Sequence, residues 1–229
     1  MLVTGVGRAG QVGEAVAREL ARRGARIIAV SRSPHDVEAR VSELRDAGHA
    51  ATGIACDLAD ARAVQALARR IARDTGGRLD ALVHLAGGFA LSGPVADAGM
   101  ETWQRMQSIN LTTAFLCTHA LLPCVREARG AIVYVASAAA LPGGSAATIA
   151  AYAAAKAGVL ALMRAVAEEE RPHGVRANAI APGAIRTASN VAAMGADAEY
   201  VERDHVAAVI AFLCSSAAHA VTGQVIALA

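Results

Sequence analysis

The chain has 229 residues, of which 55% are hydrophobic and only 3% aromatic, and its formal charge is +2. This length fits one domain with a substantial core, taken here as residues 1–229. There is no dense basic run, and the apolar stretches are shorter than the roughly 18 to 20 residues of a membrane span, so we expect neither a nucleic-acid partner nor a membrane partner.

Short apolar, β-branched runs alternate with longer stretches rich in alanine, leucine and arginine. The short runs predict strands near residues 2–4, 26–31, 50–55, 80–85, 131–136, 175–181 and 224–228. The longer stretches predict helices near residues 12–23, 36–47, 60–75, 101–127, 151–170 and 203–215. This alternation favours an α/β fold of three layers, a doubly wound, Rossmann-like parallel sheet of about seven strands with helices on both faces. In such a sheet ligands lie beyond the carboxyl ends of the strands, so functional residues are expected there.

The first strand is followed by the glycine-rich segment TGVGRAGQVG, residues 4–13. Glycines there allow the backbone to approach a pyrophosphate, and the next helix offers free N–H groups and its positive dipole end. Two frames overlap, because Gly5, Gly7 and Gly10 spell G-x-G-x-x-G, whereas a longer Thr-Gly loop would end at Gly13. Taken alone, the segment could be only a tight turn.

The second strand ends in AVSRS, residues 29–33. Folds that bind NAD usually place an acid here for the ribose 2′-hydroxyl, whereas a nearby arginine accommodates the 2′-phosphate of NADP. Ser31 stands in the expected position of the acid, and Arg32 follows it. The pattern favours NADP(H) over NAD(H), unless Arg32 is simply one more surface arginine in an arginine-rich chain.

The third and fourth strands also lead into residues with possible cofactor contacts. Asp57 and Leu58 follow the third strand. Asp57 could accept a hydrogen bond from an adenine amino group, or Asp57 or Asp60 could cap the next helix. After the fourth strand, the small residues Ala86 and Gly87 leave room for a flat ring.

After the fifth strand, Ser137 opens a long loop, and Tyr152 and Lys156 follow at positions i and i+4 of a predicted helix. An ammonium beside a phenol stabilises the phenolate and lowers the pKa of the phenol, which makes the tyrosine a proton donor or acceptor near neutral pH. Most tyrosine–lysine pairs at this spacing merely face solvent. This pair stands out because Lys156 is the only lysine among 22 basic residues and Tyr152 is one of three tyrosines.

The cysteines and the N-terminal residues indicate the cellular compartment in which the protein is expected. Cys56, Cys117, Cys124 and Cys214 show neither C-x-x-C spacing nor a nearby histidine pattern. We interpret them as reduced, mostly buried thiols and expect no bound metal. No charged-then-apolar leader precedes the first motif, so we expect a cytoplasmic protein.

These residues resemble the short-chain dehydrogenase/reductase family, and the match covers nearly the whole chain. The shared features, in the family's order, are the TG…G loop, the acid after the third strand, AG after the fourth, Asn110 in SINLTTAF, Ser137, YAAAK with Tyr152 and Lys156, and NAIAPGAIRT at 178–187. YxxxK alone is common by chance, whereas its combination with the upstream serine and asparagine and with the downstream PG-x-I-x-T is highly specific.

The resemblance implies hydride transfer between a nicotinamide cofactor and a substrate carbon, with Tyr152 as general acid or base. It implies that Lys156 lowers the pKa of Tyr152 and holds the nicotinamide ribose, that Ser137 orients the substrate oxygen, and that Asn110 helps to hold a relay water. The cofactor-binding residues expected in this way are Gly5, Gly10, Val12, Arg32, Asp57, Leu58, Ala86, Gly87, Tyr152, Lys156, Ile185 and Thr187.

The glycine loop departs from the family pattern. Its last glycine follows its threonine by nine positions instead of the usual seven. The segment from Gly13 to Gly24 matches the family's first helix in length, so Gly13 is predicted to be the last glycine of a loop two residues longer than usual. Such a loop is similar to that of the divergent enoyl-reductase branch, but there the lysine follows the tyrosine by seven, a position that holds Val159 here. Arg8 and Gln11 have no assigned role.

Further departures lie around the predicted substrate site. The usual N-N-A-G begins here with His84 and Leu85, so we expect a strand-tying hydrogen bond to be missing, and His84 could act in the site or fill a structural slot. The spacing from Ser137 to Tyr152 is two residues longer than in many members, and only about sixteen residues separate Thr187 from the next predicted helix, where relatives often carry a longer lid. We therefore expect an open pocket or one completed by a partner subunit.

The main hypothesis is an NADP(H)-dependent oxidoreductase that interconverts a small ketone or aldehyde and its alcohol. A non-catalytic dinucleotide-binding regulator is an alternative, motivated by the short lid and the altered AG motif but opposed by the intact Ser/Tyr/Lys/Asn set. An enoyl-thioester reductase is another, motivated by the loop length but opposed by the lysine spacing. Alanine-rich faces on the helices near 101–127 and 151–170 permit close helix approach, so a homotetramer or homodimer is expected.

Overall fold

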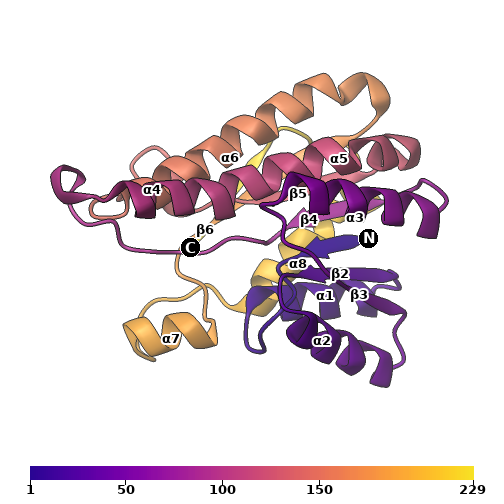
Figure 1. The fold of residues 1–229 in the computed structure, drawn as a ribbon, viewed down its shortest axis with the longest axis horizontal. Coiled ribbons are helices and arrows are strands. Elements are labelled where there is room, and N and C mark those ends of the chain that lie inside the picture. The colour runs from indigo at the N-terminus through magenta and orange to yellow at the C-terminus, as the bar shows by residue number, and fades with distance from the viewer.

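A computed structural model describes residues 1–229, and its seven strands form a single parallel sheet (Figure 1). In spatial order the strands are β3 (Ala51–Ala55), β2 (Ile27–Ser31), β1 (Leu2–Thr4), β4 (Ala81–His84), β5 (Ala131–Val135), β6 (Arg176–Pro182) and β7 (Val225–Leu228). The strand order reverses between β1 and β4, which is the switch point where doubly wound sheets bind ligands. The predicted fold class is confirmed.

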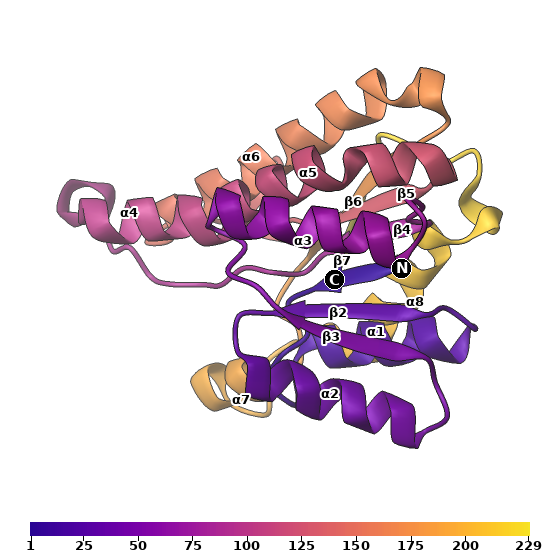
Figure 2. The ribbon, with the colours of Figure 1, turned by 45° about the vertical axis from the view of Figure 1, so that its right-hand side comes forward.

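Helices cover both faces of this sheet, as Figures 1 and 2 show. One face carries α3 (Ala61–Asp74), α5 (Thr113–Ala128) and α6 (Ala150–Glu169), and the other carries α1 (Val12–Arg22), α2 (Pro34–Asp46) and α8 (Arg203–Cys214). Each face has its own core of fully buried side chains, such as Leu121 on the first face and Leu20 on the second. Short 3-10 turns lie at Val95–Asp97, Ala138–Ala140, Arg171–His173 and Ser216–Ala218.

The helix predicted over residues 101–127 is one continuous helical run with an irregular middle. It consists of α4 (Met100–Met106), a π-helical turn (Gln107–Thr112) and α5. Such π turns inside longer helices occur frequently at functional sites. Together this run and α6 contain two stretches long and apolar enough to cross a membrane, but 44% and 50% of these stretches are buried inside the protein. Burial of this kind is what core helices covering a sheet show.

Helix α7 (Ala188–Met194) was not predicted from the sequence, which indicated only a connection there. The helix is held by its cap: the Thr187 Oγ1 atom accepts a hydrogen bond from the Asn190 backbone N–H at 3.1 Å. It ends at Gly195, whose φ of 88° lies in the left-handed region. With only seven residues, the helix is too short to show a clear apolar period. In Figures 1 and 2 it stands apart from the helices that cover the sheet.

Candidate active site

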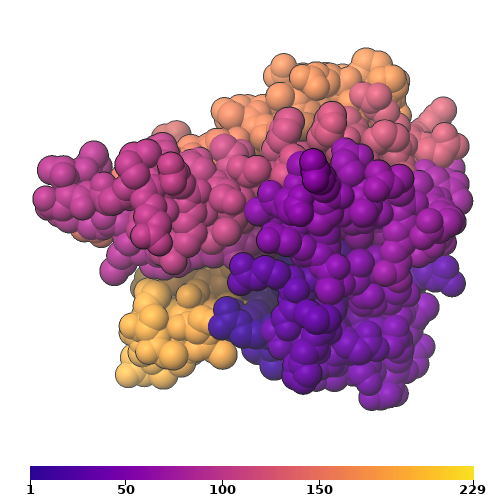
Figure 3. Space-filling model, viewed as in Figure 1, coloured from indigo at the N-terminus to yellow at the C-terminus, as the bar shows by residue number.

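A cleft of about 420 Å³ lies at the carboxyl ends of β1 to β4. Figure 3 shows the surface hollowed between the yellow-orange α7 segment and the indigo and magenta residues beside it. Seven of the residues expected to bind a cofactor line this cleft, namely Gly5, Val12, Arg32, Asp57, Leu58, Ala86 and Gly87. Gly10 and Thr187 lie outside its lining. The Gly10 carbonyl oxygen accepts a hydrogen bond from the backbone N–H of Ala188, the residue after Thr187, at 3.1 Å.

Close packing at the glycine loop explains why α1 begins where it does. A side chain at Gly13 would place its Cβ 2.3 Å from the carbonyl oxygen of Gly5, so only glycine lets the helix start against the end of β1. Gly5 itself has a φ of 76°, which favours glycine. This close contact between helix and strand is the role that the last glycine of a dinucleotide loop plays.

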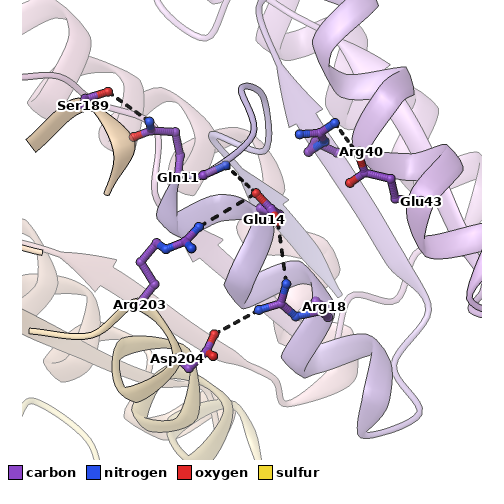
Figure 4. Close-up of polar contacts among 9 residues, drawn as sticks. Gln11, Glu14, Arg18, Arg40, Glu43, Ser189, Arg203 and Asp204 are labelled. Carbon is purple, nitrogen blue, oxygen red and sulfur yellow. Dashed lines mark hydrogen bonds and ion pairs between the residues drawn. The ribbon is translucent and has the colours of Figure 1, made fainter. Parts of the chain in front are cut away.

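The glycine loop is tied to α7, although the two are far apart in the sequence (Figure 4). The Gln11 Nε2 atom donates a hydrogen bond to Ser189 Oγ at 2.9 Å, and the Gly10 N–H donates to Glu14 Oε2 at 2.6 Å. Ion pairs extend the link toward α8: Glu14–Arg203 and Arg18–Asp204. Gln11, without a role in the sequence analysis, therefore joins the loop to α7.

Two arginines and two aspartates, Asp36 and Asp57, are the charged residues on the cleft lining. Arg8 and Arg32 both line the cleft, both are exposed, and neither forms an ion pair with another residue. Asp36, in the first turn of α2, lines the same cleft, and its backbone N–H donates to Ser33 Oγ at 3.2 Å. The formal charges of these four side chains cancel, so a phosphate would be favoured by the two guanidiniums rather than by the net charge of the lining.

The two open readings of the acids after β3 are resolved by their contacts. Asp60 caps α3, because its Oδ1 atom accepts hydrogen bonds from the Arg62 and Ala63 N–H groups at 2.8 Å and 3.4 Å. Asp57 accepts only the N–H of Ala59, at 3.0 Å, and lines the cleft. The capping role thus belongs to Asp60, and Asp57 keeps acceptor capacity toward the cleft.

Ser137, Tyr152 and Lys156 come together beyond the end of β5. Lys156 and Tyr152 lie one turn apart on α6, with the Lys156 Nζ atom 5.8 Å from the centre of the Tyr152 ring. The Nζ atom donates a hydrogen bond to the Val135 carbonyl oxygen at 2.8 Å. Ser137 is close enough to Tyr152 to lower the pKa of its hydroxyl, and its Oγ atom accepts the Ala139 N–H at 3.3 Å. A phenol, a buried amine and a hydroxyl group are therefore grouped at one strand end.

The pKa values of this group differ in one respect from the sequence-based expectation. Burial raises the pKa of Tyr152 above its ordinary value, and the hydrogen bond from Ser137 only partly opposes this. Burial also lowers the pKa of Lys156 to about 8. The expected lowering of the tyrosine pKa by the lysine is therefore wrong for this structure: the ammonium bonds Val135, and the cost of burying a phenolate is the larger effect.

Asn110 orders the loop after β4 from within the π turn. Its Nδ2 atom donates to the carbonyl oxygens of Gly88 and Met106 at 3.0 Å and 3.1 Å, and its Oδ1 atom accepts the Gly88 N–H at 3.2 Å. A Cβ on Gly87 would lie 2.6 Å from Asn110 Oδ1 and 3.5 Å from Lys156 Nζ. Because Gly87 has no side chain, Asn110 and Lys156 can both lie next to it.

His84 fills a structural slot. Its Nε2 atom lies 3.1 Å from Thr118 Oγ1, and its ring stacks on that of Tyr134 with centroids 5.0 Å apart. Burial lowers its pKa to about 3, so the ring is neutral at physiological pH. It does not line the cleft, and its neighbours hold it inside the core rather than at the reacting groups.

The strand-tying hydrogen bond that was expected to be missing is replaced by Thr4. Its Oγ1 atom donates to the Val83 carbonyl oxygen at 3.4 Å and accepts the N–H groups of Leu85 and Ala86 at 3.1 Å and 3.0 Å. These bonds join the end of β1 to the small-residue segment after β4. The altered N-N-A-G motif therefore leaves no gap between the two strands.

One residue that sequence reasoning missed lies against the predicted proton donor. The Phe89 ring meets the Tyr152 ring edge-on, with centroids 5.2 Å apart. The available signal was its position directly after the small residues of the fourth strand end, in a chain with only three phenylalanines.

The chain is similar to known proteins along nearly its whole length. Residues 5–228 match the family model described as "Enoyl-(Acyl carrier protein) reductase". The chain is 38% identical to cis-4-hydroxycyclohexanecarboxylate dehydrogenase of Sinomonas cyclohexanicum, over 97% of this chain and 92% of the relative. It is 36% identical to D-threitol dehydrogenase of Mycolicibacterium smegmatis, over 97% of this chain and 88% of the relative.

A solved structure shares both the fold and the sequence. It is described as an NAD(P)-dependent gluconate 5-dehydrogenase from Beutenbergia cavernae, with NADP bound at low occupancy. The TM-score is 0.88 and the identity 33%, over 99% of this chain and 93% of that chain. Together with the family model, these matches along nearly the full length establish that the chain belongs to the short-chain dehydrogenase/reductase family of oxidoreductases.

Proposed function

We propose that the protein reduces a small ketone or aldehyde with NADP(H), or oxidises the corresponding alcohol. The observation that carries this proposal is the grouping of Ser137, Tyr152 and Lys156 beyond β5, next to a cleft that begins at the glycine loop. A protein that only bound a dinucleotide would not need a buried phenol, amine and hydroxyl at this point.

The cleft fits a dinucleotide because its floor is built from residues with little or no side chain. Gly5 and Gly87 bring backbone to the surface, and the loop enters α1 at Val12, whose N–H would meet the pyrophosphate. Asp57 would contact the adenine. Ile185 and Thr187 would meet the carboxamide of the nicotinamide, the group that supplies or accepts the hydride when it is bound.

The side chains would divide the proton chemistry between them. The raised pKa keeps the Tyr152 phenol protonated at neutral pH, so it would donate its proton to the carbonyl oxygen during reduction. Ser137 would hydrogen-bond and polarise the same oxygen. Lys156 would hold the nicotinamide ribose and return a proton to the tyrosine. Because the Asn110 amide is engaged by Gly88 and Met106, a relay water would bind to the Asn110 backbone instead.

Arg8 and Arg32 support NADP(H) as the preferred cofactor. Both are unpaired cations on the lining at the end of β2, where the ribose phosphate of NADP would lie. Asp36 and Asp57 are acids on the same lining and would repel that phosphate, so the preference depends on the two guanidiniums lying closer to it than the two carboxylates. The NADP bound by the Beutenbergia cavernae protein is consistent with this choice.

The test is oxidation of NADPH and NADH against a panel of ketones, aldehydes and enoyl thioesters, with wild type, Tyr152→Phe and Tyr134→Phe. Tyr134 is a matched control because its hydroxyl bonds Thr118 inside the core. We expect carbonyl reduction that falls about 10²- to 10⁴-fold in Tyr152→Phe and persists in the control. Turnover unchanged by Tyr152→Phe would sink the proposal. Turnover of enoyl thioesters alone would make the protein an enoyl reductase, and tight NADPH binding without any turnover would make it a regulator.

We also propose a cytoplasmic homo-oligomer, a dimer or a tetramer. The cytoplasm suits the four cysteines, which are all buried and free. Oligomerisation suits α5, which exposes half of the Phe115 side chain, stacked on the His119 ring. Sedimentation analysis that finds only monomers at micromolar concentration would contradict the second part of this proposal.

A further inference from the structure

Phe89 combines two properties that seldom occur together. Its ring meets Tyr152 edge-on, with the ring planes at 77°. At the same time the side chain is 61% exposed, so most of its surface has no protein neighbour. A large apolar side chain that is exposed beside a proton donor has no protein partner to cover it. Another molecule that binds there can cover it instead.

The segment that carries Phe89 is fixed on both sides. On the side of the preceding residue, Gly88 is held through both its N–H and its carbonyl oxygen by Asn110. On the other side, the Thr148 carbonyl oxygen accepts three hydrogen bonds, from Ser92 N–H at 2.8 Å, Ser92 Oγ at 3.1 Å and Gly93 N–H at 3.1 Å. The exposed ring is therefore held in place, because its backbone is anchored one residue before it and three residues after it.

The second anchor requires a strained backbone. Thr148 has a φ of 62°, and the only other non-glycine residue with positive φ is Arg129. For a β-branched residue this conformation is a genuine outlier. The Thr148 side chain is exposed and forms no hydrogen bond, so what the strain preserves is the position of its carbonyl group. Backbone strain of this kind concentrates where a binding site needs a fixed geometry.

The fixed segment is also uncharged. Residues 86–94 read AGGFALSGP, and Leu91 within them is 68% exposed. The segment therefore offers a substrate an aromatic face and an aliphatic side chain but no ion pair. A heavily hydroxylated or charged open chain would lose water there without gaining a partner, whereas an apolar ring would cover the exposed phenyl face.

We infer that Phe89 is the substrate-recognition residue and that the substrate carries an apolar ring, aromatic or alicyclic, next to its carbonyl or carbinol carbon. The ring packs on the free face of Phe89, which directs the oxygen toward Tyr152 and Ser137. Ser92 and Thr148 are positioning residues that act through Phe89. This inference rests on the proposed carbonyl reduction and adds the substrate class to it.

The first experiment compares substrates that do and do not carry a ring. Acetophenone and cyclohexanone are the ring-bearing probes, and hydroxyacetone is the open-chain probe. Steady-state kcat and KM are measured for wild type, Phe89→Ala, Phe89→Tyr and Phe212→Ala, the last being a partly exposed phenylalanine on α8. We expect Phe89→Ala to raise KM for the ring-bearing probes about tenfold or more, with a smaller change in kcat and little change for hydroxyacetone. Phe89→Tyr should keep the wild-type KM, and Phe212→Ala should match wild type.

A matched pair of variants at Thr148 tests the anchor. Glycine adopts a φ of 62° freely, so Thr148→Gly keeps the carbonyl in place and should behave as wild type. Proline is locked near −65°, so Thr148→Pro should release Ser92 and raise the ring-selective KM as Phe89→Ala does. The loss of the backbone N–H in the proline variant breaks no hydrogen bond, because the Thr148 N–H has no partner. A thermal midpoint close to wild type checks that the proline variant is folded.

The outcomes separate this inference from the proposed function. If the wild type reduces no carbonyl compound, the proposed function fails and the inference fails with it. If it reduces hydroxyacetone in a Tyr152-dependent way but not the ring-bearing probes, only the inference is overturned. The same holds if Phe89→Ala raises KM equally for every probe, or if Thr148→Pro leaves all KM values unchanged.

Discussion

The catalytic half of the site and its phosphate half are built in opposite ways. Lys156 and Asn110 are buried, and their side-chain nitrogen atoms donate hydrogen bonds to backbone carbonyl oxygens. Arg8 and Arg32, by contrast, are exposed and unpaired, on a loop and at a strand end. Buried ionisable groups contribute to folding energetics, whereas exposed ones act mainly on ligands. Substitutions in the first half should therefore change stability, and those in the second should change only cofactor binding.

The largest expected effect comes from the buried base at the end of β4. The pKa of His84 is about 3 in the folded chain, against about 6.5 when unfolded, so the unfolded chain binds more protons between these values. Stability present above pH 6.5 is therefore lost as the pH falls toward 3, by on the order of 5 kcal/mol in total. His84→Gln cannot titrate and should lose less stability than wild type between pH 7 and pH 4, measured by urea unfolding. Parallel stability profiles for the two proteins would contradict the assignment.

Lys156 should change stability with pH in the same direction, but at alkaline pH. Its folded pKa of about 8 lies below the unfolded value near 10.5, so the charged amine destabilises the fold below pH 8, and this penalty disappears as the pH rises to 10.5. Lys156→Met should therefore be more stable than wild type at pH 7, by about 3 kcal/mol, and the advantage should shrink between pH 8 and pH 10. The readout is the difference in unfolding free energy between variant and wild type. A difference that does not depend on pH would show that the amine is not desolvated.

In the phosphate half the expected effects concern affinity and leave stability unchanged. Arg32→Ala should weaken NADPH binding about tenfold while changing NADH binding little, because only NADPH carries the 2′-phosphate. Arg8→Ala should act in the same direction. Arg62→Ala, an exposed arginine on α3 outside the cleft, is the matched control. Titration of each cofactor by fluorescence measures all four proteins. An equal loss for NADPH and NADH would refute the assignment of NADP(H).

The smallest expected effect is at the link between the glycine loop and α7. Gln11→Ala removes one exposed hydrogen bond to Ser189, so NADPH should dissociate only a few times faster, and stability should stay within about 0.5 kcal/mol of wild type. Gln104→Ala, an exposed glutamine on α4, is the control. Stopped-flow displacement of NADPH measures the rate. If Gln11→Ala lost as much stability as the variants of the catalytic half, the proposed difference between a stability-determining half and a ligand-binding half would be contradicted.

The grouping of Ser137, Tyr152 and Lys156 could be predicted from the sequence because these residues are rare and their spacing is set by the backbone. A single lysine four residues after a tyrosine must share a helix face with it, and a serine at a strand end must lie on the ligand side of a parallel sheet. The strand bounds could also be predicted, because short continuous apolar runs of this kind are buried as strands of the sheet. What could not be predicted was the balance of pKa effects on Tyr152, because desolvation depends on packing that spacing does not reveal.

The connecting segments were harder to predict. Helix α7 depends on a cap by Thr187 and is too short for a periodic pattern. A threonine gives no indication of positive φ, so the anchor at Thr148 had no signal in the sequence. The link from Gln11 to Ser189 joins residues 178 positions apart, and nothing local to either one indicates the other.

That distance along the chain has a consequence for the order of synthesis. Every residue that closes the glycine loop from outside, from Ala188 to Asp204, leaves the ribosome after the six strands β1 to β6 are complete. The apolar face of α1 also waits for α8, since Leu20 and Ile210 belong to one core cluster. A nascent chain that lacks its last quarter therefore exposes the α1 face and cannot hold the loop. It would depend on chaperones at that stage, and it would acquire its cofactor only after synthesis is complete.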